Sequence, residues 1–320
     1  MRIRLAVVGA ALALAVHGAA EPPPAASVYN RASPVATTGA AQATGGAGQG
    51  GPQEAAAQAE RIVAGSLLTI ARADSLSVRL RQKARIGDRV LVGGGRYVQS
   101  GHGEEQRFRY ESMLEDDTHA FEVLEVCDGL FAWTFRHSGP EPPTLQRVDV
   151  RRLRERLEQL GAAEPVDVAP YIGGLQGSLW MLREWFRFTV AEPGVIDGTP
   201  VWCVEGRWVP EGIACILPEV TAAAHRPGGV APAELPDGVP WSVRLSIGRS
   251  DLVLRRIEWL AIPGPRPVVT TVPEPIAVLE LQDVEINGPV DSTAFFYQPA
   301  TAGLMDLTDQ QLQQLRLWRP

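Results

Sequence analysis

The sequence predicts an α+β, mostly β fold: one large curved antiparallel sheet or open barrel, with helices covering one face. Three observations predict it. Roughly ten segments alternate apolar and polar residues as strands do. Most of these segments follow one another through short turns, and helical patterns occur at only a few places. A doubly wound parallel sheet is excluded, because strand and helix patterns do not alternate regularly.

Composition indicates a globular protein with ample material for a core. The chain has 320 residues, of which 45% are hydrophobic and 21% are charged. Its formal net charge is -7 and its isoelectric point is near 5.4. Nucleic acid is excluded as a partner, because phosphate neutralisation needs clustered surplus Lys and Arg. Three cysteines are too few for a disulfide-built scaffold.

The first twenty residues have the features of a secretory signal peptide. Arg2 and Arg4 supply the positive charge, residues 5–16 the apolar run, and Gly18-Ala19-Ala20 the cleavage site. We therefore expect residues 1–20 to be removed and the protein to be exported to the periplasm or cell envelope. No cysteine follows, so a lipid-anchored lipoprotein is not expected. The alternative is an uncleaved membrane anchor.

Residues 21–53 are rich in Ala, Pro and Gly and cannot bury enough apolar surface to offset their ordering entropy. They are predicted to be a disordered linker. The remainder shows no interior linker, so one domain is predicted over residues 54–308. A Pro-rich and Gly-rich stretch at 218–240 is interpreted as a loop insertion. Residues 309–320 are expected to form a short C-terminal helix and tail.

The first half of the domain begins with a predicted helix at 54–74, in which Ile62, Val63, Leu67 and Ile70 recur at helical spacing. Strands are predicted next at 77–85, 89–99, 106–114, 120–126, 130–136 and 145–148. Gly93-Gly94-Gly95 interrupts the second of them and indicates a bulge or sharp bend. Asp128-Gly129 predicts a hairpin turn.

The second half begins with a helix at 150–160, capped by Asp149, and a second short helix at 175–185. An Asp197-Gly198 turn follows the first strand after them. Strands are predicted at 186–191, 200–208, 241–247, 252–261, 276–286 and 293–297, and a terminal helix at 309–317.

Aromatic residues gather at alternating strand positions and near one helix–strand junction. They can line an apolar cavity on the concave face that accepts acyl chains. The alternative is a plain hydrophobic core, which any large sheet packed on helices requires. The candidate lipid-binding residues are Phe108, Tyr110, Phe121, Trp133, Phe135, Trp180, Trp185 and Phe186.

No constellation of residues calls for catalysis. The sequence has no phosphate-binding glycine loop, nucleophile elbow, HExxH pair or CxxC motif. His119 follows Asp116-Asp117 and His102 precedes Glu104-Glu105, but neither group has the spacing of a built metal site. We therefore expect no enzyme activity, no metal and no cofactor.

Cys203 and Cys215 flank a short Gly/Pro turn, and in an oxidising compartment they can form a disulfide. Cys127 would then remain unpaired. The alternative is three buried free thiols.

The order of several short motifs resembles the LolA-like lipoprotein-carrier superfamily of periplasmic proteins. These motifs are Ala73-Asp74-Ser75-Leu76-Ser77, Arg81-Gln82, Arg107-Phe108-Arg109-Tyr110-Glu111, Val126-Cys127-Asp128-Gly129-Leu130-Phe131-Ala132-Trp133, Leu252-Val253-Leu254-Arg255-Arg256-Ile257-Glu258, the segment 281–290 and Phe295-Phe296-Tyr297-Gln298-Pro299. The resemblance covers about residues 58–308. Glu104-Glu105 stands where the carriers have Arg-Pro.

The resemblance implies an unclosed antiparallel β-barrel with a helical lid and a hydrophobic cavity, and it implies no catalysis. The expected function is binding of a lipid or the acyl chains of a lipoprotein, by a monomer. A second hypothesis is an envelope protein-interaction or stress-sensing module on the same fold, with an envelope protein as partner. A hydrolase is the third and least favoured hypothesis.

Overall fold

A computed structural model of the chain describes residues 51–160, 169–236, 238–262, 273–299 and 303–317. The predicted signal peptide and the predicted linker up to residue 50 lie outside these ranges. Within the described residues, no helix has the length and apolar character needed to cross a membrane.

The described strands form one open sheet of twelve strands in the order β12-β6-β5-β4-β3-β2-β1-β11-β10-β9-β8-β7. Neighbouring strands are antiparallel except at one edge, where β12 runs parallel to β6. The edge strands β7 and β12 do not pair with each other, so the sheet is not closed. The strands are β1 (Ser75–Ile86), β2 (Arg89–Ser100), β3 (Arg107–Glu115), β4 (Ala120–Cys127), β5 (Phe131–Ser138), β6 (Thr144–Asp149), β7 (Phe186–Ile196), β8 (Thr199–Trp208), β9 (Ser242–Gly248), β10 (Leu254–Ala261), β11 (Glu274–Ile286) and β12 (Leu304–Asp306). The predicted fold class is confirmed.

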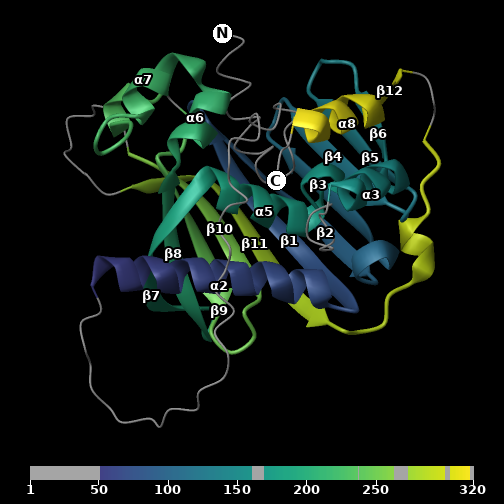
Figure 1. The fold of residues 1–320 in the computed structure, drawn as a ribbon, viewed down its shortest axis with the longest axis horizontal. Helices are drawn as coiled ribbons and strands as arrows, with labels where there is room; N and C mark the ends of the chain where they lie inside the picture. Colours follow the sequence, from purple (N-terminus) through teal and green to yellow (C-terminus); the bar gives the residue numbers. More distant parts are fainter. Residues whose placement is uncertain (1–50, 161–168, 237, 263–272, 300–302, 318–320) are drawn as a thin grey trace.

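Helices lie on one face and around the rim of this sheet (Figure 1). They are α2 (Pro52–Arg72), α3 (Val150–Gln159), α4 (Ala169–Ile172), α5 (Gly174–Trp185), α6 (Pro210–Ile216), α7 (Thr221–Ala224) and α8 (Thr308–Leu317). Figure 1 shows α2 crossing the strands of one half of the sheet, with α5 nearby. The predicted apolar stripe of α2 is buried. The side chain of Glu60 in α2 accepts a hydrogen bond from the backbone N–H of Phe188 (3.2 Å) in the edge strand β7.

We call the face of the sheet that packs against α2 and α5 the inner face, and the opposite face the outer face. The main core lies between the inner face and these helices. Residues paired across strands point to the same face, and residues two apart on one strand do so as well. The inner face of β1, β2 and β3 therefore includes Val78, Tyr97 and Tyr110, which are successive cross-strand partners.

The three glycines of β2 do not make a bulge, because β2 pairs with both neighbours through them without a register shift. They permit close backbone approach instead. A Cβ atom added to Gly95 would lie 1.8 Å from the carbonyl oxygen of Glu111, and one added to Gly93 would lie 1.9 Å from that of Met113. No side chain fits at either position, so this strand requires glycine there.

The turns follow the sequence signals closely. Asp128 accepts hydrogen bonds from the backbone N–H groups of Leu130 and Phe131, which closes the predicted β4–β5 hairpin. Asp149 caps α3 as expected, by accepting from the backbone N–H groups of Arg151 and Arg152. The turn therefore fixes the register of β4 and β5, and the cap fixes the first residue of α3.

The predicted strand at 293–297 is wrong. Ser292–Phe295 forms a 3₁₀ helix, because Asp291 caps it by accepting from the backbone N–H of Thr293 (2.9 Å). The parallel strand β12 and the short helix α6 were not predicted. The stretch 218–240, interpreted as a loop insertion, contains short helical turns that include α7.

Candidate functional site

Three of the predicted lipid-binding residues lie on the inner face of the sheet. Phe108 and Tyr110 project from β3 and are buried. Phe121 on β4 is the cross-strand partner of Leu114, so it shares this face and is half-buried. The ring of Phe108 stacks on that of Tyr97, with ring centroids 6.1 Å apart.

Trp133 and Phe135 lie on the outer face, because their partners Val126 and Leu124 alternate with the inner residues of β4. Trp133 packs edge-on against Tyr297 (6.1 Å between centroids), and the guanidinium of Arg147 lies 5.6 Å from its ring. These two residues therefore cannot line one surface together with Phe108 and Tyr110.

The remaining candidates lie at the helix–strand junction that ends α5. Trp185 and Phe186 are buried, and both rings contact Trp208, with the Phe186–Trp208 centroids 4.2 Å apart. Trp180 is partly buried against the same core. Six of the eight candidates therefore lie on the inner face or on helix α5, which packs against it, in two groups at different places.

Sequence reasoning missed a set of buried polar side chains on the inner face. Gln82 donates to the hydroxyl of Tyr110 (2.7 Å) and accepts from the hydroxyl of Ser112 (2.7 Å). Tyr97 donates to the amide oxygen of Gln99 (2.8 Å). The signal was present at Gln82, which lies between the exposed charges of Arg81 and Lys83.

Glu125 is the charged member of this set. Its carboxylate accepts a hydrogen bond from the backbone N–H of Gly174 (3.0 Å), at the first residue of α5. Gly173 and Gly174 both have positive φ, 96° and 73°. A Cβ on Gly173 would lie 2.7 Å from this carboxylate. The two glycines thus let the helix terminus approach Glu125, where the helix dipole favours a negative charge.

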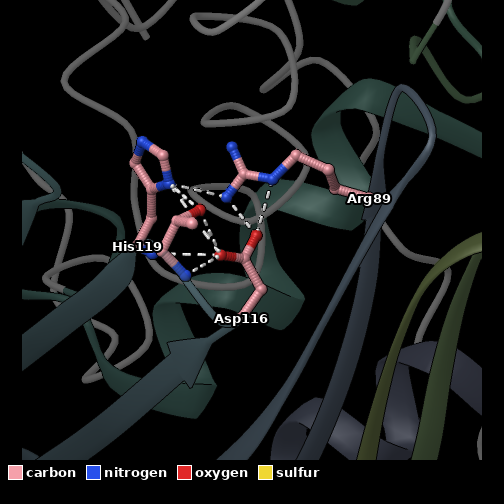
Figure 2. A network of polar contacts seen from close by, with 4 residues as sticks. Arg89, Asp116 and His119 are labelled. Atoms are coloured by element: carbon pink, nitrogen blue, oxygen red, sulfur yellow. Dashed lines mark hydrogen bonds and ion pairs between the residues drawn. The ribbon is translucent and has the colours of Figure 1, made fainter.

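Figure 2 shows a second polar cluster, between the first residue of β2 and the β3–β4 turn. Asp116 accepts from the backbone N–H groups of Thr118 (2.8 Å) and His119 (3.0 Å) and from the Nε of Arg89 (2.6 Å). The backbone of Thr118 and the Arg89 guanidinium hold the pKa of Asp116 well below its usual range. Nδ1 of His119 lies 2.8 Å from Arg89 Nη2, which can only donate, so this nitrogen accepts.

This cluster joins the start of β2 to the β3–β4 turn. In the described part of the chain, no three His, Cys, Asp or Glu side chains are placed to hold a metal ion. Two thiols are described. Cys127 is a buried free thiol, and burial raises its pKa to about 11. Cys203 is a partly buried free thiol on β8, while the side chain of Cys215 lies outside the described residues.

No protein family matches the sequence, and no curated protein matches it. The chain is similar to several solved structures. LprF from Mycobacterium bovis shares 13% identity at a TM-score of 0.34, over 73% of this chain and 95% of that one. Lipoprotein LppX from Mycobacterium tuberculosis shares 10% identity at a TM-score of 0.29, over 74% and 98%. A LolA superfamily protein from Nitrosomonas europaea shares 12% identity at a TM-score of 0.25, over 75% and 97%. At these identities and TM-scores, the similarity does not assign the function of those proteins to this chain.

Proposed function

We propose that this chain is a non-enzymatic, exported protein of the cell envelope that binds an acyl chain between its inner face and helices α2 and α5. The observation that carries the proposal is the apolar inner face of β8–β11 and β1. Its residues include Val204, Leu245, Ile257, Leu279 and Leu281, all buried.

The physical driving force is removal of the acyl chain from water. Burial of each CH₂ group contributes about 0.8 kcal/mol, so an apolar face suffices without polar chemistry. The sheet is open at β7 and β12, and its inner face is covered by helices rather than by a second sheet. Helices can move away from a sheet without breaking its hydrogen-bond ladders, which supports entry of a ligand on this side.

Native mass spectrometry and organic extraction of the purified protein test the proposal. We expect co-purified lipid, and rebinding of a fluorescent fatty acid after the lipid is removed. Absence of both from a folded preparation would contradict the proposal.

A matched pair of valines separates lipid binding from general stability. Val204 on β8 belongs to the core against α2, whereas Val126 lies on the outer face of β4, and both are 0% exposed. Each change to Phe is expected to cost about 1–3 kcal/mol through overpacking. Only Val204→Phe should also weaken binding of the fatty acid. Equal loss of binding in both variants would count against an interior site.

A second candidate function is protein interaction through the outer face of β2 and β3. Val92 and Met113 are 54% and 48% exposed, and both flank Gly94 on this face. Serine substitutions at these two positions should leave lipid binding intact under the first proposal. If the purified protein carries no lipid and the same substitutions release a co-purified partner, the second function is favoured.

A further inference from the structure

The inner face is divided into an apolar half and a polar half. On β8–β11 its side chains are aliphatic or aromatic. On β2–β5 it includes Gln99, Tyr110, Ser112 and Glu125, all buried. The two halves meet at β1, where Leu80 and Gln82 are inner neighbours. One continuous face thus has an apolar region beside a buried polar region. Such a face is complementary to an amphipathic ligand.

Within the polar half, most groups already have partners. The hydroxyl of Tyr110 bonds with Gln82, and the hydroxyl of Tyr97 bonds with Gln99, whose own amide donates to the carbonyl of Ile70 in the last turn of α2. These groups hold the sheet and helix together. They therefore leave little capacity for a ligand.

Two atoms at the start of α5 do not have partners. Glu125 has a side chain only 2% exposed. Its Oε2 atom binds the N–H of Gly174, while Oε1 has no hydrogen-bond partner within the described structure. Gln176 is also buried, and its Oε1 accepts from Gln106 (2.7 Å), while its Nε2 has no partner there. One unsatisfied acceptor and one unsatisfied donor thus lie by the first turn of the same helix.

Both atoms belong to side chains at the first turn of α5. Glu125 binds the N–H of Gly174, the first residue of the helix, and Gln176 lies two residues further along it. A buried polar group without a hydrogen-bond partner destabilises the protein, so a ligand that satisfies both atoms is favoured.

The local charge selects the kind of ligand. Arg136 Nη2 lies 4.0 Å from Oε1 of Glu125, so this carboxylate already has a counter-ion. The Glu125 carboxylate would repel an anionic head group, and the Arg136 guanidinium would repel a cationic one. A neutral hydroxyl can donate to Glu125 and accept from Gln176.

We propose that Glu125 and Gln176, at the first turn of α5, bind the neutral hydroxyl-bearing head of an acyl lipid such as a glycerol monoester. This inference rests on the proposed function, since it places the head group of the same ligand. It adds a preference for hydroxyl-bearing esters over free fatty acids of equal chain length.

Three probes with the same acyl chain test the inference on the full-length, delipidated protein. Monopalmitoylglycerol carries hydroxyls, methyl palmitate is neutral without them, and palmitate is anionic. Displacement of a bound fluorescent probe should show monopalmitoylglycerol binding about tenfold more tightly than methyl palmitate, as expected for a hydrogen bond to a charged group. Palmitate should bind more weakly than monopalmitoylglycerol.

Variants assign that preference to the site. Glu125→Gln and Gln176→Met should each remove most of the preference for the hydroxyl-bearing probe and leave binding of methyl palmitate within about twofold. Glu122→Gln is the matched control, because Glu122 lies on the same strand but is exposed on the outer face. Thermal unfolding of each variant checks that it folds. The comparison of the three probes on the unaltered protein tests the preference even if a variant does not fold.

The outcomes separate the two proposals. If all three probes bind equally well, or palmitate binds best, the head-group site is wrong while acyl binding stands. If the preference survives in both folded variants, its assignment to Glu125 and Gln176 is wrong. If no probe binds, both proposals fail.

Discussion

The hydroxyl groups of Tyr97 and Tyr110 are enclosed by protein on the inner face, and each forms a hydrogen bond with a glutamine side chain. Burial raises the pKa of both above the usual value of 10.0. A phenolate at either place would lose its hydration, and the nearby negative charge of Glu125 adds to the cost. The two tyrosines are therefore held in the neutral form.

Alkaline titration tests this environment. In the unfolded chain each phenol loses its proton near pH 10, whereas in the native state Tyr97 and Tyr110 retain theirs. Stability must then fall as pH rises above about 10. The absorbance of tyrosinate should show that two of the five tyrosines ionise only when the protein unfolds. A Tyr97→Phe, Tyr110→Phe double variant should lose only this late step, and early ionisation of all five would contradict the assignment.

At the scale of elements, the C-terminal segment forms an outer strap, of which the sequence predicted only the terminal helix α8. After β11 it passes over the outer face, where Phe295 is buried and lies 5.5 Å from the guanidinium of Arg107. It then adds β12 beside β6, and α8 packs near α3. Arg147 donates to Asp306 (3.1 Å from Nε), so one ion pair joins β6 to β12.

Acid should loosen this strap. Burial alone would raise the pKa of Asp306, but hydrogen bonds from Thr308 and Arg147 outweigh it and lower the pKa to about 2, from 3.8. The stabilisation is therefore complete above the ordinary value and lost as pH falls from about 4 through 2. Hydrogen exchange of the β12 and α8 amides, corrected for intrinsic rates, should accelerate in that window.

Asp306→Asn should loosen the same amides at neutral pH and remove their acid dependence. Asp283→Asn is the control, since Asp283 on β11 pairs with Arg79 (2.7 Å), seven strand positions from β12 in the sheet. Unchanged exchange in Asp306→Asn would show that this ion pair does not hold β12 in place.

At the scale of the whole molecule, a single sheet connects every part of the described chain, and its centre is glycine-rich. β2 and β1 are the middle strands of the order. Gly93 and Gly95 project no side chain toward the inner face there, and neighbouring carbonyls occupy the space that a Cβ would need. The apolar and polar halves of the inner face meet across these strands.

Gly95→Ala should therefore destabilise the whole protein, with a loss at or above the upper end of the about 1–3 kcal/mol typical of overpacking. Gly51→Ala is the control, because a Cβ there meets nothing within 4 Å. Urea unfolding followed by circular dichroism and by tryptophan fluorescence should give one coincident, shifted transition. Separate transitions for the two probes would show that the halves fold independently.

The sequence predicted the fold class, α2, the cap of α3 and the β4–β5 hairpin, because each depends on local signals such as periodicity, a capping aspartate or an Asp-Gly turn. It could not decide the face on which Trp133 lies, since alternation along β5 shows which residues share a face but not which face the helices cover. Only the register Cys127–Ala132 and Val126–Trp133 settles this. The strand expected at 293–297 failed because alternating Phe295 and Tyr297 imitate a strand, while the Asp291 cap starts a 3₁₀ helix.

The sequence by itself determined that this chain forms a large antiparallel sheet with a few helices, since strand alternation and turn chemistry are written into neighbouring residues. The tertiary structure alone brought Glu125 to the start of α5, forty-nine residues further along the chain. It also divided the aromatic residues between two faces. Both outcomes depend on pairing between segments that are distant in the sequence. The register across several strands is set when the sheet assembles, and the pattern of neighbouring residues does not determine it.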